Sequence, residues 1–285
     1  MKRCVVSPGI HLEKAEGGGV KPLGALTTQD LNYYALFWDE IVIPTTAAIH
    51  ISLPNEDEYE TLGIINRPVL NYFITDGLVE KYLEFQNEIL NKKRESDRTS
   101  DWSLHQIGKS FVSHEEQINS VLGIRFEIFN ALPVPNSEVP LADILEFKAR
   151  KTQSFEDFHG YLDDIYLQMR SAPDDPLLKS KAYCKFEKSL LNIRRMSNDE
   201  WRGKLDGYKF SWGFDSAKEN IESLIDGVLA CVSFSAGDYA SGTKDVISIA
   251  AKGMKITKNE SVMLGSEKEV KGMRFLADGY KEGLF

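Results

Sequence analysis

Three residues in the middle of the chain have side chains and a spacing suited to binding a metal ion. Glu156, His159 and Asp163 are three and four positions apart, so a helix through them places all three on one face. Carboxylate and imidazole groups at this spacing hold divalent metals in helical bundles. A zinc or manganese ion there would polarise a phosphoryl or carbonyl oxygen and generate hydroxide near neutral pH. This pattern predicts a metal-dependent hydrolase or nuclease, with Asp39 as a further acidic residue from the N-terminal part.

The same three residues also fit a helix surface that binds no ligand. A metal site needs a fourth ligand and side chains that point inward. The apolar seam of this helix passes through Phe158 and Leu162, which leaves the three polar residues on its flank. Charged side chains in that position are usually solvated or paired with neighbours. Two interpretations therefore stay open: no cofactor, or a divalent metal held by Glu156, His159 and Asp163.

No other segment contains a complete catalytic or nucleotide-binding motif. Gly108, Lys109 and Ser110 resemble the end of a phosphate-binding loop, but that motif needs a glycine at position 103, where this chain has Ser103. Such a loop also follows a strand, and no strand is predicted before Gly108. The nucleophile elbow, the zinc-protease motif and the Cys/His arrangements of catalytic sites are absent from the sequence. The sequence therefore leaves open whether the protein is an enzyme.

Composition and charge narrow the class of protein. The 285 residues are 42% hydrophobic and 27% charged, which is ordinary for globular proteins, and three widely separated cysteines favour neither disulfides nor a zinc knuckle. A formal charge of −9 disfavours direct binding of nucleic acid. No segment approaches the roughly 18 apolar residues of a membrane span, and no signal peptide is evident. We therefore expect a cytoplasmic protein.

The first 135 residues predict a lobe that contains both strands and helices. Residues 3–12 favour a strand interrupted by a Ser-Pro-Gly turn. Thr27 and Asp30 have the spacing of a capping box at the start of a helix. The remaining predicted elements of this lobe are a strand at 41–43, a short helix after residue 55, a helix at 76–94, a short helix at 113–123 and a half-buried strand at 124–132.

The middle of the chain predicts a helical hairpin. Apolar residues at spacings of three or four favour one long helix from about residue 140 to residue 171, followed by a turn at 173–176 and a second helix at 177–195. The last predicted elements are a short helix capped by Ser197 and Glu200, strands at 207–212 and 254–257, helices that begin at 216 and 243, and a closing helix at 267–279.

These elements together predict an α+β fold in three parts. Residues 1–135 form an α/β lobe, residues 136–205 form the helical hairpin, and residues 206–285 form a smaller, mostly helical lobe with short strands.

Two strings of residues carry a resemblance to a known family. They are YALFWDEIVIP at 34–44 and LADILEFK at 141–148. Both resemble stretches of an uncharacterised bacterial family whose members carry a domain of unknown function and sometimes lie near phage-defence genes. The resemblance implies a bacterial cytoplasmic protein with an N-terminal α/β part and a helical middle, and it identifies no catalytic residues.

The sequence therefore supports two main functional hypotheses. The first is a protein-interaction component of a bacterial phage-defence or toxin-antitoxin-like assembly, which binds a protein partner or a second copy through the helical hairpin. The absence of a complete catalytic motif, the hairpin and the resemblance all favour it. The second is the metal-dependent hydrolase or nuclease that uses Glu156, His159 and Asp163. A third, a membrane-acting effector that uses the small residues at 224–253, is weaker because the charged residues Asp226, Asp238, Lys244 and Asp245 interrupt that segment.

Overall fold

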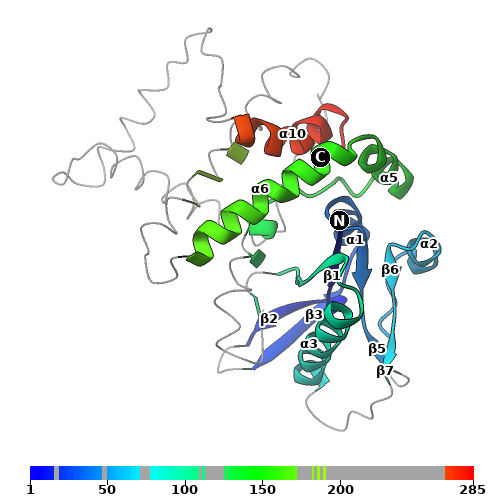
Figure 1. Cartoon of the computed structure of the whole chain (residues 1–285). Coiled ribbons are helices and arrows are strands. Elements are labelled where there is room, and N and C mark those ends of the chain that lie inside the picture. The colour runs from blue at the N-terminus through cyan, green and yellow to red at the C-terminus, as the bar shows by residue number, and fades with distance from the viewer. Residues whose placement is uncertain are drawn as a thin grey trace, which may run out of the picture. The chain divides into compact units, whose positions relative to one another are not determined.

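The computed structural model divides the chain into two compact units. Of the described residues, unit 1 comprises those up to Thr152 together with Glu282–Phe285, and unit 2 comprises those from Gln153 to Lys281. The structure describes residues 1–15, 19–46, 50–70, 78–108, 111–112, 125–126, 128–171, 182, 185–186, 189–190 and 267–285. Within these residues helices and strands both occur, as the α+β prediction requires (Figure 1). The predicted boundaries after residues 135 and 205 stay predictions.

Unit 1 is built on a parallel sheet of four strands. Its strands are β1 (Lys2–Val6), β4 (Glu40–Val42), β6 (Ile65–Asn66) and β8 (Ser100–Leu104). Their order across the sheet is β6-β4-β1-β8, and every neighbouring pair is parallel. The chain therefore moves outward from β1 through β4 to β6, and then returns to the other side of β1 for β8.

Helices alternate with these strands along the chain. They are α1 (Thr28–Phe37), α2 (Glu56–Thr61) and α3 (Leu78–Ser96). The short strands are β2 (Ile10–Lys14), which pairs antiparallel with β3 (Val20–Ala25), and β5 (Thr45–Thr46), which pairs parallel with β7 (Val69–Leu70). Parallel strands need crossover connections, and helices supply them here. The strands and helices predicted in the first 100 residues are confirmed as β1, β2, α1, β4, α2 and α3. Sequence patterns did not indicate β3, β5, β6, β7 or β8.

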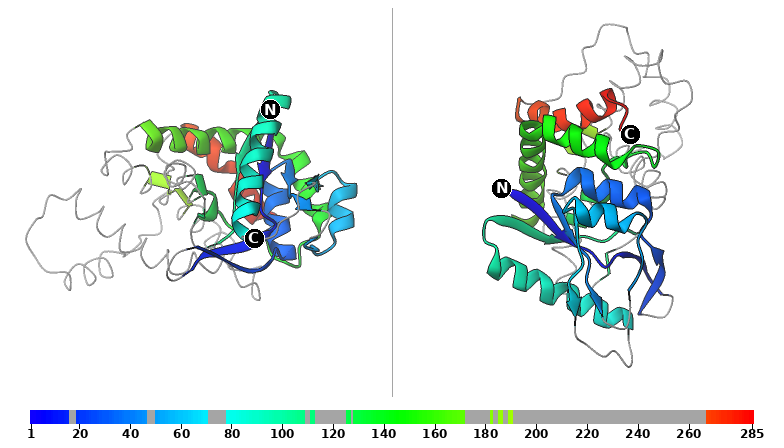
Figure 2. Two further views of the ribbon diagram at one scale, coloured as in Figure 1. Left: turned by 90° about the horizontal axis from the view of Figure 1, so that it is seen from below. Right: turned by 90° about the vertical axis from the view of Figure 1, so that its right-hand side faces the viewer.

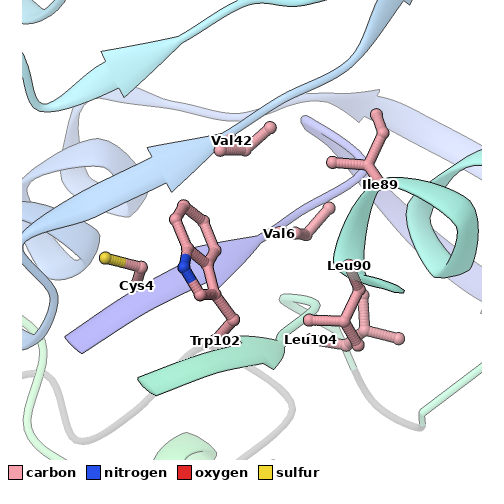
Figure 3. Packing of buried hydrophobic residues seen from close by; sticks show 7 residues of the cluster. All are labelled: Cys4, Val6, Val42, Ile89, Leu90, Trp102 and Leu104. Carbon is pink, nitrogen blue, oxygen red and sulfur yellow. The ribbon is translucent and has the colours of Figure 1, made fainter. Parts of the chain in front are cut away.

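The two faces of the sheet are covered by different helices. α3 packs on one face through Ile89 and Leu90, and α1 lies on the other side of β1 (Figures 1 and 2). The core under α3 consists of Cys4, Val6, Val42, Ile89, Leu90, Trp102 and Leu104 (Figure 3). Burial raises the pKa of the Cys4 thiol to about 12, and Glu40 adds to the shift, so this cysteine is a packing residue. Because side chains alternate along a strand, the neighbours of these strand residues face α1.

The start of α1 has the predicted capping box. Thr27 accepts a hydrogen bond from the backbone N–H of Asp30 at 3.3 Å, and the Asp30 carboxylate accepts one from the backbone N–H of Thr27 at 2.6 Å. Every residue from Asp30 to Phe37 is buried. A helix buried on all sides carries polar side chains only where they find partners, and those of α1 connect it to several other segments of unit 1.

The predicted helix from residue 140 to residue 171 is wrong as one element. It is two helices, α5 (Leu141–Arg150) and α6 (Thr152–Ser171), because Lys151 leaves helical geometry with φ −108° and ψ 24°. Thr152 donates its hydroxyl hydrogen to the carbonyl oxygen of Ala149 at 2.9 Å. A threonine hydroxyl that bonds backbone carbonyls in this way competes with the continuing helix. The division between the two units also falls at Thr152.

The predicted strand at 124–132 is also wrong. Residues 125–126 and 128–130 are helical. Phe126 and Phe129 are buried and three positions apart, which is a helical spacing. The same segment also alternates apolar and polar residues, which is the pattern of a strand. Their contacts with His105, described below, depend on residues far away in the sequence. The alternation of this short segment therefore could not decide between the two structures.

Unit 2 contains α6 and α10 (Glu267–Lys281), and α10 confirms the predicted closing helix. A Cβ atom on Gly272 of α10 would lie 2.5 Å from Cβ of Tyr161 on α6, so the two helices cross in close contact. Phe275 packs against Phe155 and Phe158, with ring centroids 5.3 Å and 5.7 Å apart. Residues 182, 185–186 and 189–190 are helical, as predicted for the second arm of the hairpin. The rest of that arm, Cys184 and Cys231, the elements predicted between 197 and 257, and the short helix predicted at 113–123 lie outside the described residues.

None of the helices in the part of the chain that the structure describes is long and apolar enough to cross a membrane.

Candidate functional site

The carboxyl ends of β1 and β8 lie side by side where the strand order reverses. Ser7 follows β1 directly and His105 follows β8 directly. The backbone N–H of His105 donates to the carbonyl oxygen of Val6 at 3.1 Å, which continues the pairing of the two strands beyond their ends. In open α/β sheets ligands bind outside the carboxyl ends of the strands at such a reversal. Ser7 and His105 therefore stand at the position where this architecture places a ligand.

A tyrosine from α1 joins these two residues. The hydroxyl oxygen of Tyr34 lies 3.0 Å from Oγ of Ser7 and 3.1 Å from Nδ1 of His105. All three side chains are buried, and His105 is only 1% exposed. The three residues, which we call the Ser7–Tyr34–His105 chain, form a continuous line of polar atoms between α1 and the ends of two strands. Such a buried polar line is stable only because its members are hydrogen-bonded to one another.

Aromatic rings surround His105. The ring centroids of Trp38 and Tyr34 lie 4.9 Å and 5.4 Å from that of the imidazole, and those of Phe129 and Phe126 lie 6.0 Å and 6.2 Å away. Burial lowers the pKa of His105 to about 3, from an ordinary value of 6.5, and the charge of Arg125 adds to the effect. His105 is therefore a neutral imidazole at physiological pH, able to donate from one ring nitrogen and accept at the other.

Tyr34 is likewise uncharged. Burial raises the pKa of its hydroxyl well above the usual range, the hydrogen bond from Ser7 lowers it, and the Asp30 carboxylate raises it. The Ser7–Tyr34–His105 chain thus carries no net charge at neutral pH. Among the described residues, Nε2 of His105 has no hydrogen-bond partner. The Ser7–Tyr34–His105 chain therefore ends at a buried polar atom, Nε2 of His105, with which a ligand could form a hydrogen bond.

The turn after β1 brings a backbone hydrogen-bond donor to Ser7, at the other end of the Ser7–Tyr34–His105 chain. The backbone N–H of Gly9 donates to Oγ of Ser7 at 3.4 Å. Gly9 has φ +72°, and a Cβ atom there would lie 2.5 Å from Cγ2 of Ile43. Only glycine combines that backbone conformation with the close approach of Ile43. The Ser-Pro-Gly turn that the sequence predicted is therefore what holds Ser7 in place.

A second polar group occupies the N-terminus of α1. One carboxylate oxygen of Asp30 lies 2.8 Å from Nε2 of His11 and 2.8 Å from Oγ1 of Thr27. A helix N-terminus attracts anions because its backbone N–H groups are unpaired. Here the buried carboxylate of Asp30 already takes that place, so a phosphate ligand would meet a like charge. The carboxylate of Asp30 therefore disfavours an anion at the N-terminus of α1.

The two strings that carry the family resemblance meet at the other end of α1. Nζ of Lys148, on α5, lies 2.9 Å from Oδ1 of Asp39 and donates to the carbonyl oxygens of Ala35 and Trp38. The second carboxylate oxygen of Asp39 accepts from the backbone N–H of Arg3 at 2.8 Å. Burial lowers the pKa of Lys148, and Asp39 opposes that shift. Asp39 thus has a structural role at the end of α1. Lys148 donates to carbonyl oxygens in the last turn of this helix, which have no hydrogen-bond partner within the helix.

The three predicted metal ligands all lie on α6, as the spacing indicated, but in different surroundings. Glu156 is exposed, Asp163 is half-buried, and His159 is 2% exposed with its ring centroid 4.5 Å from that of Phe155. Within the ranges that the structure describes, no group of three or more His, Cys, Asp or Glu side chains is placed to hold a metal ion. The metal role of Glu156, His159 and Asp163 stays a prediction.

Sequence patterns missed the Ser7–Tyr34–His105 chain because its members are 27 and 71 positions apart. The one signal available was a strand before residue 105, which the sequence analysis did not predict. β8 ends at Leu104, so a strand does precede Gly108, contrary to expectation. Ser103 lies inside that strand and donates to the carbonyl oxygen of Cys4 at 3.4 Å. The position where a phosphate-binding loop needs its first glycine therefore belongs to β8; Lys109 and Ser110 lie outside the described residues.

Comparison with known proteins places the chain in an uncharacterised group. The model of a family of unknown function (DUF6236) matches residues 22–276. Both strings that carry the resemblance, 34–44 and 141–148, lie inside this range. No curated protein and no solved structure matches the chain. The expectation of an uncharacterised family is confirmed.

Proposed function

The chain belongs to the family of unknown function DUF6236, and we propose that its unit 1 binds a small organic molecule at the carboxyl ends of β1 and β8. One observation carries this proposal: the strand order β6-β4-β1-β8 reverses between the two strands that Ser7 and His105 follow. Ligand binding at that reversal is a rule for open parallel sheets, and it is applied here as an analogy between folds. The buried Ser7–Tyr34–His105 chain lies at the same place and supplies polar groups there.

The chemistry of the edge supports a ligand that is not a phosphate. The glycine-rich loop that cradles phosphates in such sheets is absent after β1, where the sequence is Ser7-Pro8-Gly9. Asp30 fills the N-terminus of α1. The groups left at the edge are neutral hydroxyls, a neutral imidazole and aromatic rings. This combination of groups is typical of sites for small organic molecules, which combine apolar surfaces with a few polar anchors.

The test uses the full chain purified from its own host. Native mass spectrometry should show a small molecule bound to the protein, and Tyr34→Phe should reduce the bound fraction at least several-fold. Tyr33→Phe is the matched control, because it also removes a buried hydroxyl from α1, one that donates to the carbonyl oxygen of Phe129 at 2.5 Å. Urea unfolding of both variants checks that their stabilities are comparable. Equal occupancy in Tyr34→Phe and wild type, or no bound molecule in the wild type, contradicts the proposal.

A second candidate function is the interaction component of a bacterial phage-defence or toxin-antitoxin-like assembly. What favours it is that both described helices of unit 2 expose a large apolar side chain: Leu167 on α6 is 55% exposed and Val270 on α10 is 46% exposed. Isolated exposed residues of this kind are common, but they are also what a protein partner would cover. The bacterial origin and the link to defence rest on the resemblance of the two strings alone.

If this second function is correct, the protein forms a complex whose assembly depends on exposed residues of unit 2. Native mass spectra of the chain from its host should show a complex with another protein or a second copy. Leu167→Asp or Val270→Asp should shift it to the single chain. Leu62→Asp is the control, because Leu62 is 49% exposed but belongs to unit 1. A single uncomplexed chain in the wild type, or a complex that survives both changes in unit 2, excludes this role for α6 and α10.

The metal-dependent hydrolase can be tested with one substitution. Glu156→Ala removes an exposed carboxylate and should leave the fold intact, so a loss of bound metal in that variant would support the site. His159→Ala is a poor test, because removing a buried ring costs about 2–4 kcal/mol of stability whether or not a metal binds. Metal content that is unchanged in Glu156→Ala, or absent from the wild type, counts against the site.

A further inference from the structure

The direction of the hydrogen bonds in the Ser7–Tyr34–His105 chain follows from counting donors. Gly9 can only donate from its backbone N–H, so Oγ of Ser7 is the acceptor of that bond. Ser7 then has one hydroxyl hydrogen to give, and the hydroxyl oxygen of Tyr34 at 3.0 Å is the acceptor. Tyr34 in turn has one hydrogen, which Nδ1 of His105 can accept at 3.1 Å. In this order every hydroxyl hydrogen has an acceptor.

The reverse orders fit the distances less well. If Nδ1 of His105 carried the hydrogen and Tyr34 donated to Ser7, the hydroxyl hydrogen of Ser7 would have no acceptor among the contacts that the structure describes. If Tyr34 donated to the carbonyl oxygen of His105 instead, its bond would be 3.5 Å long, far beyond the usual O–H···O distance of about 2.7–2.8 Å. The order from Gly9 to His105 is therefore the favoured one.

We propose that His105 is held as the neutral tautomer with its hydrogen on Nε2, and that this N–H binds an acceptor oxygen of an uncharged ligand, such as an amide carbonyl. The ligand class rests on the binding function proposed above. A buried donor without an acceptor keeps the full cost of its lost hydration, which a hydrogen bond to a ligand carbonyl would offset. Described residues offer no acceptor for Nε2.

The surroundings of the His105 imidazole disfavour both anionic and cationic ligands. An anionic ligand would lose its hydration among the rings of Trp38, Phe126 and Phe129. The nearby cation, Arg125, already lies 2.8 Å from the Asp101 carboxylate, and Asp30 adds a negative charge close to Tyr34. A cationic ligand would face an N–H donor. A flat apolar molecule with an uncharged acceptor atom suits this place, because the acceptor can bond the Nε2–H group of His105 while the molecule packs against the aromatic rings.

Nuclear magnetic resonance of the full chain with ¹⁵N-labelled histidine tests the tautomer. Long-range ¹H–¹⁵N spectra distinguish a ring nitrogen that carries hydrogen from one that does not. The signals of His105, assigned by their loss in His105→Gln, should show hydrogen on Nε2 at neutral pH. Tyr34→Phe should release the lock and give a mixture of tautomers, whereas Tyr33→Phe should leave the spectrum of His105 unchanged. Hydrogen on Nδ1, or on both nitrogens, overturns the proposal.

A matched pair of probes tests the ligand class on the same signals. Benzamide and benzoate have the same shape and differ in charge, so benzamide should shift the Nε2–H resonance of His105 and benzoate should not. A shift with benzoate, or none with benzamide, overturns the assignment of an uncharged acceptor. If the Nε2–H tautomer is found but the protein from its host holds no small molecule, the binding function fails while the tautomer stands. The two failures are therefore distinguishable.

Discussion

At the scale of single residues, surroundings decide the chemistry more than residue type does. The chain has two described buried histidines, His105 in unit 1 and His159 in unit 2. His159 drew attention in the sequence because carboxylates stand three and four positions away, and His105 did not, because its hydrogen-bond partners are distant in sequence. In the structure Nδ1 of His105 lies 3.1 Å from the hydroxyl oxygen of Tyr34, which places this histidine in the candidate site. Spacing along the chain therefore drew attention to His159 and gave no sign of the contacts of His105.

The burial of His105 predicts a dependence of stability on pH. Its pKa is about 3 in the folded chain and 6.5 is the ordinary value, so the unfolded chain binds more protons between these values. The stability that His105 contributes is complete above 6.5 and is lost as the pH falls towards 3. The slope that this one group adds is at most about 1.4 kcal/mol per pH unit.

Urea unfolding from about pH 7 down to about pH 4 measures this effect. The free energy of unfolding of the wild type should fall faster with decreasing pH than that of His105→Gln, which has no group that titrates at this position. His159→Gln provides a comparison in the other unit. Parallel pH curves for the wild type and His105→Gln would show that His105 is not buried as a neutral ring.

At the scale of elements, α1 takes part in several of the polar contacts that link distant segments of unit 1. Its N-terminus is capped by Thr27 and Asp30, its middle supplies Tyr34, and its C-terminus is met by Lys148. The start of this helix was predictable because capping is local in sequence. The contact with Lys148 was not, because it links positions that are 110 apart. The same contrast explains why α5 and α6 were predicted as one helix: a local apolar stripe does not reveal a break imposed at Lys151.

Lys148→Met should destabilise the chain. The change keeps most of the side-chain volume but leaves Asp39 and the carbonyl oxygens of Ala35 and Trp38 without their cation, at an expected cost of about 1–3 kcal/mol. Lys92→Met is the control, because the Lys92–Glu88 pair at 2.5 Å is exposed and should contribute less than about 1 kcal/mol. Urea unfolding measures both. In a double-mutant cycle, adding Asp39→Asn should cost less in Lys148→Met than in the wild type; simple additivity would argue against the pair.

Two glycines in the helices of unit 2 should respond in opposite directions to alanine. Gly272→Ala places a methyl group 2.5 Å from Cβ of Tyr161, so overpacking should cost about 1–3 kcal/mol despite the better helix propensity of alanine. Gly160→Ala meets nothing within 4 Å and should stabilise the chain by up to about 1 kcal/mol. Thermal unfolding of the two variants gives the comparison. Equal stability of Gly272→Ala and wild type would mean that α10 and α6 do not cross closely.

At the scale of the whole molecule, the sequence predicted element types better than their arrangement. The mixed α+β composition and most helices of the described residues follow from capping and apolar periodicity. The order β6-β4-β1-β8 does not, because β1 and β8 pair across about 100 positions through contacts that no local pattern encodes. The candidate site depends on this order, since it brings Ser7 next to His105. It was therefore invisible for the same reason that the sheet topology was.

The path of the chain yields a final prediction, because residues 282–285 return to unit 1 after α10 in unit 2. The backbone N–H of Asn136 donates to the carbonyl oxygen of Leu284 at 3.0 Å, and Arg150 pairs with Glu282 at 2.6 Å. Leu284 is buried. Leu284→Ala should therefore lower the free energy of unfolding by about 2–5 kcal/mol, as for other buried leucines.

Leu62→Ala is the matched control within unit 1, because Leu62 is largely exposed and should change stability by no more than about 0.5 kcal/mol. Hydrogen exchange followed by mass spectrometry shows where the loss acts. Faster exchange in Leu284→Ala should appear in peptides of unit 1, including α1 and α5, because residue 284 packs into that unit. Faster exchange confined to α6 and α10 would instead mean that residues 282–285 support unit 2, and that the chain does not return to its first unit.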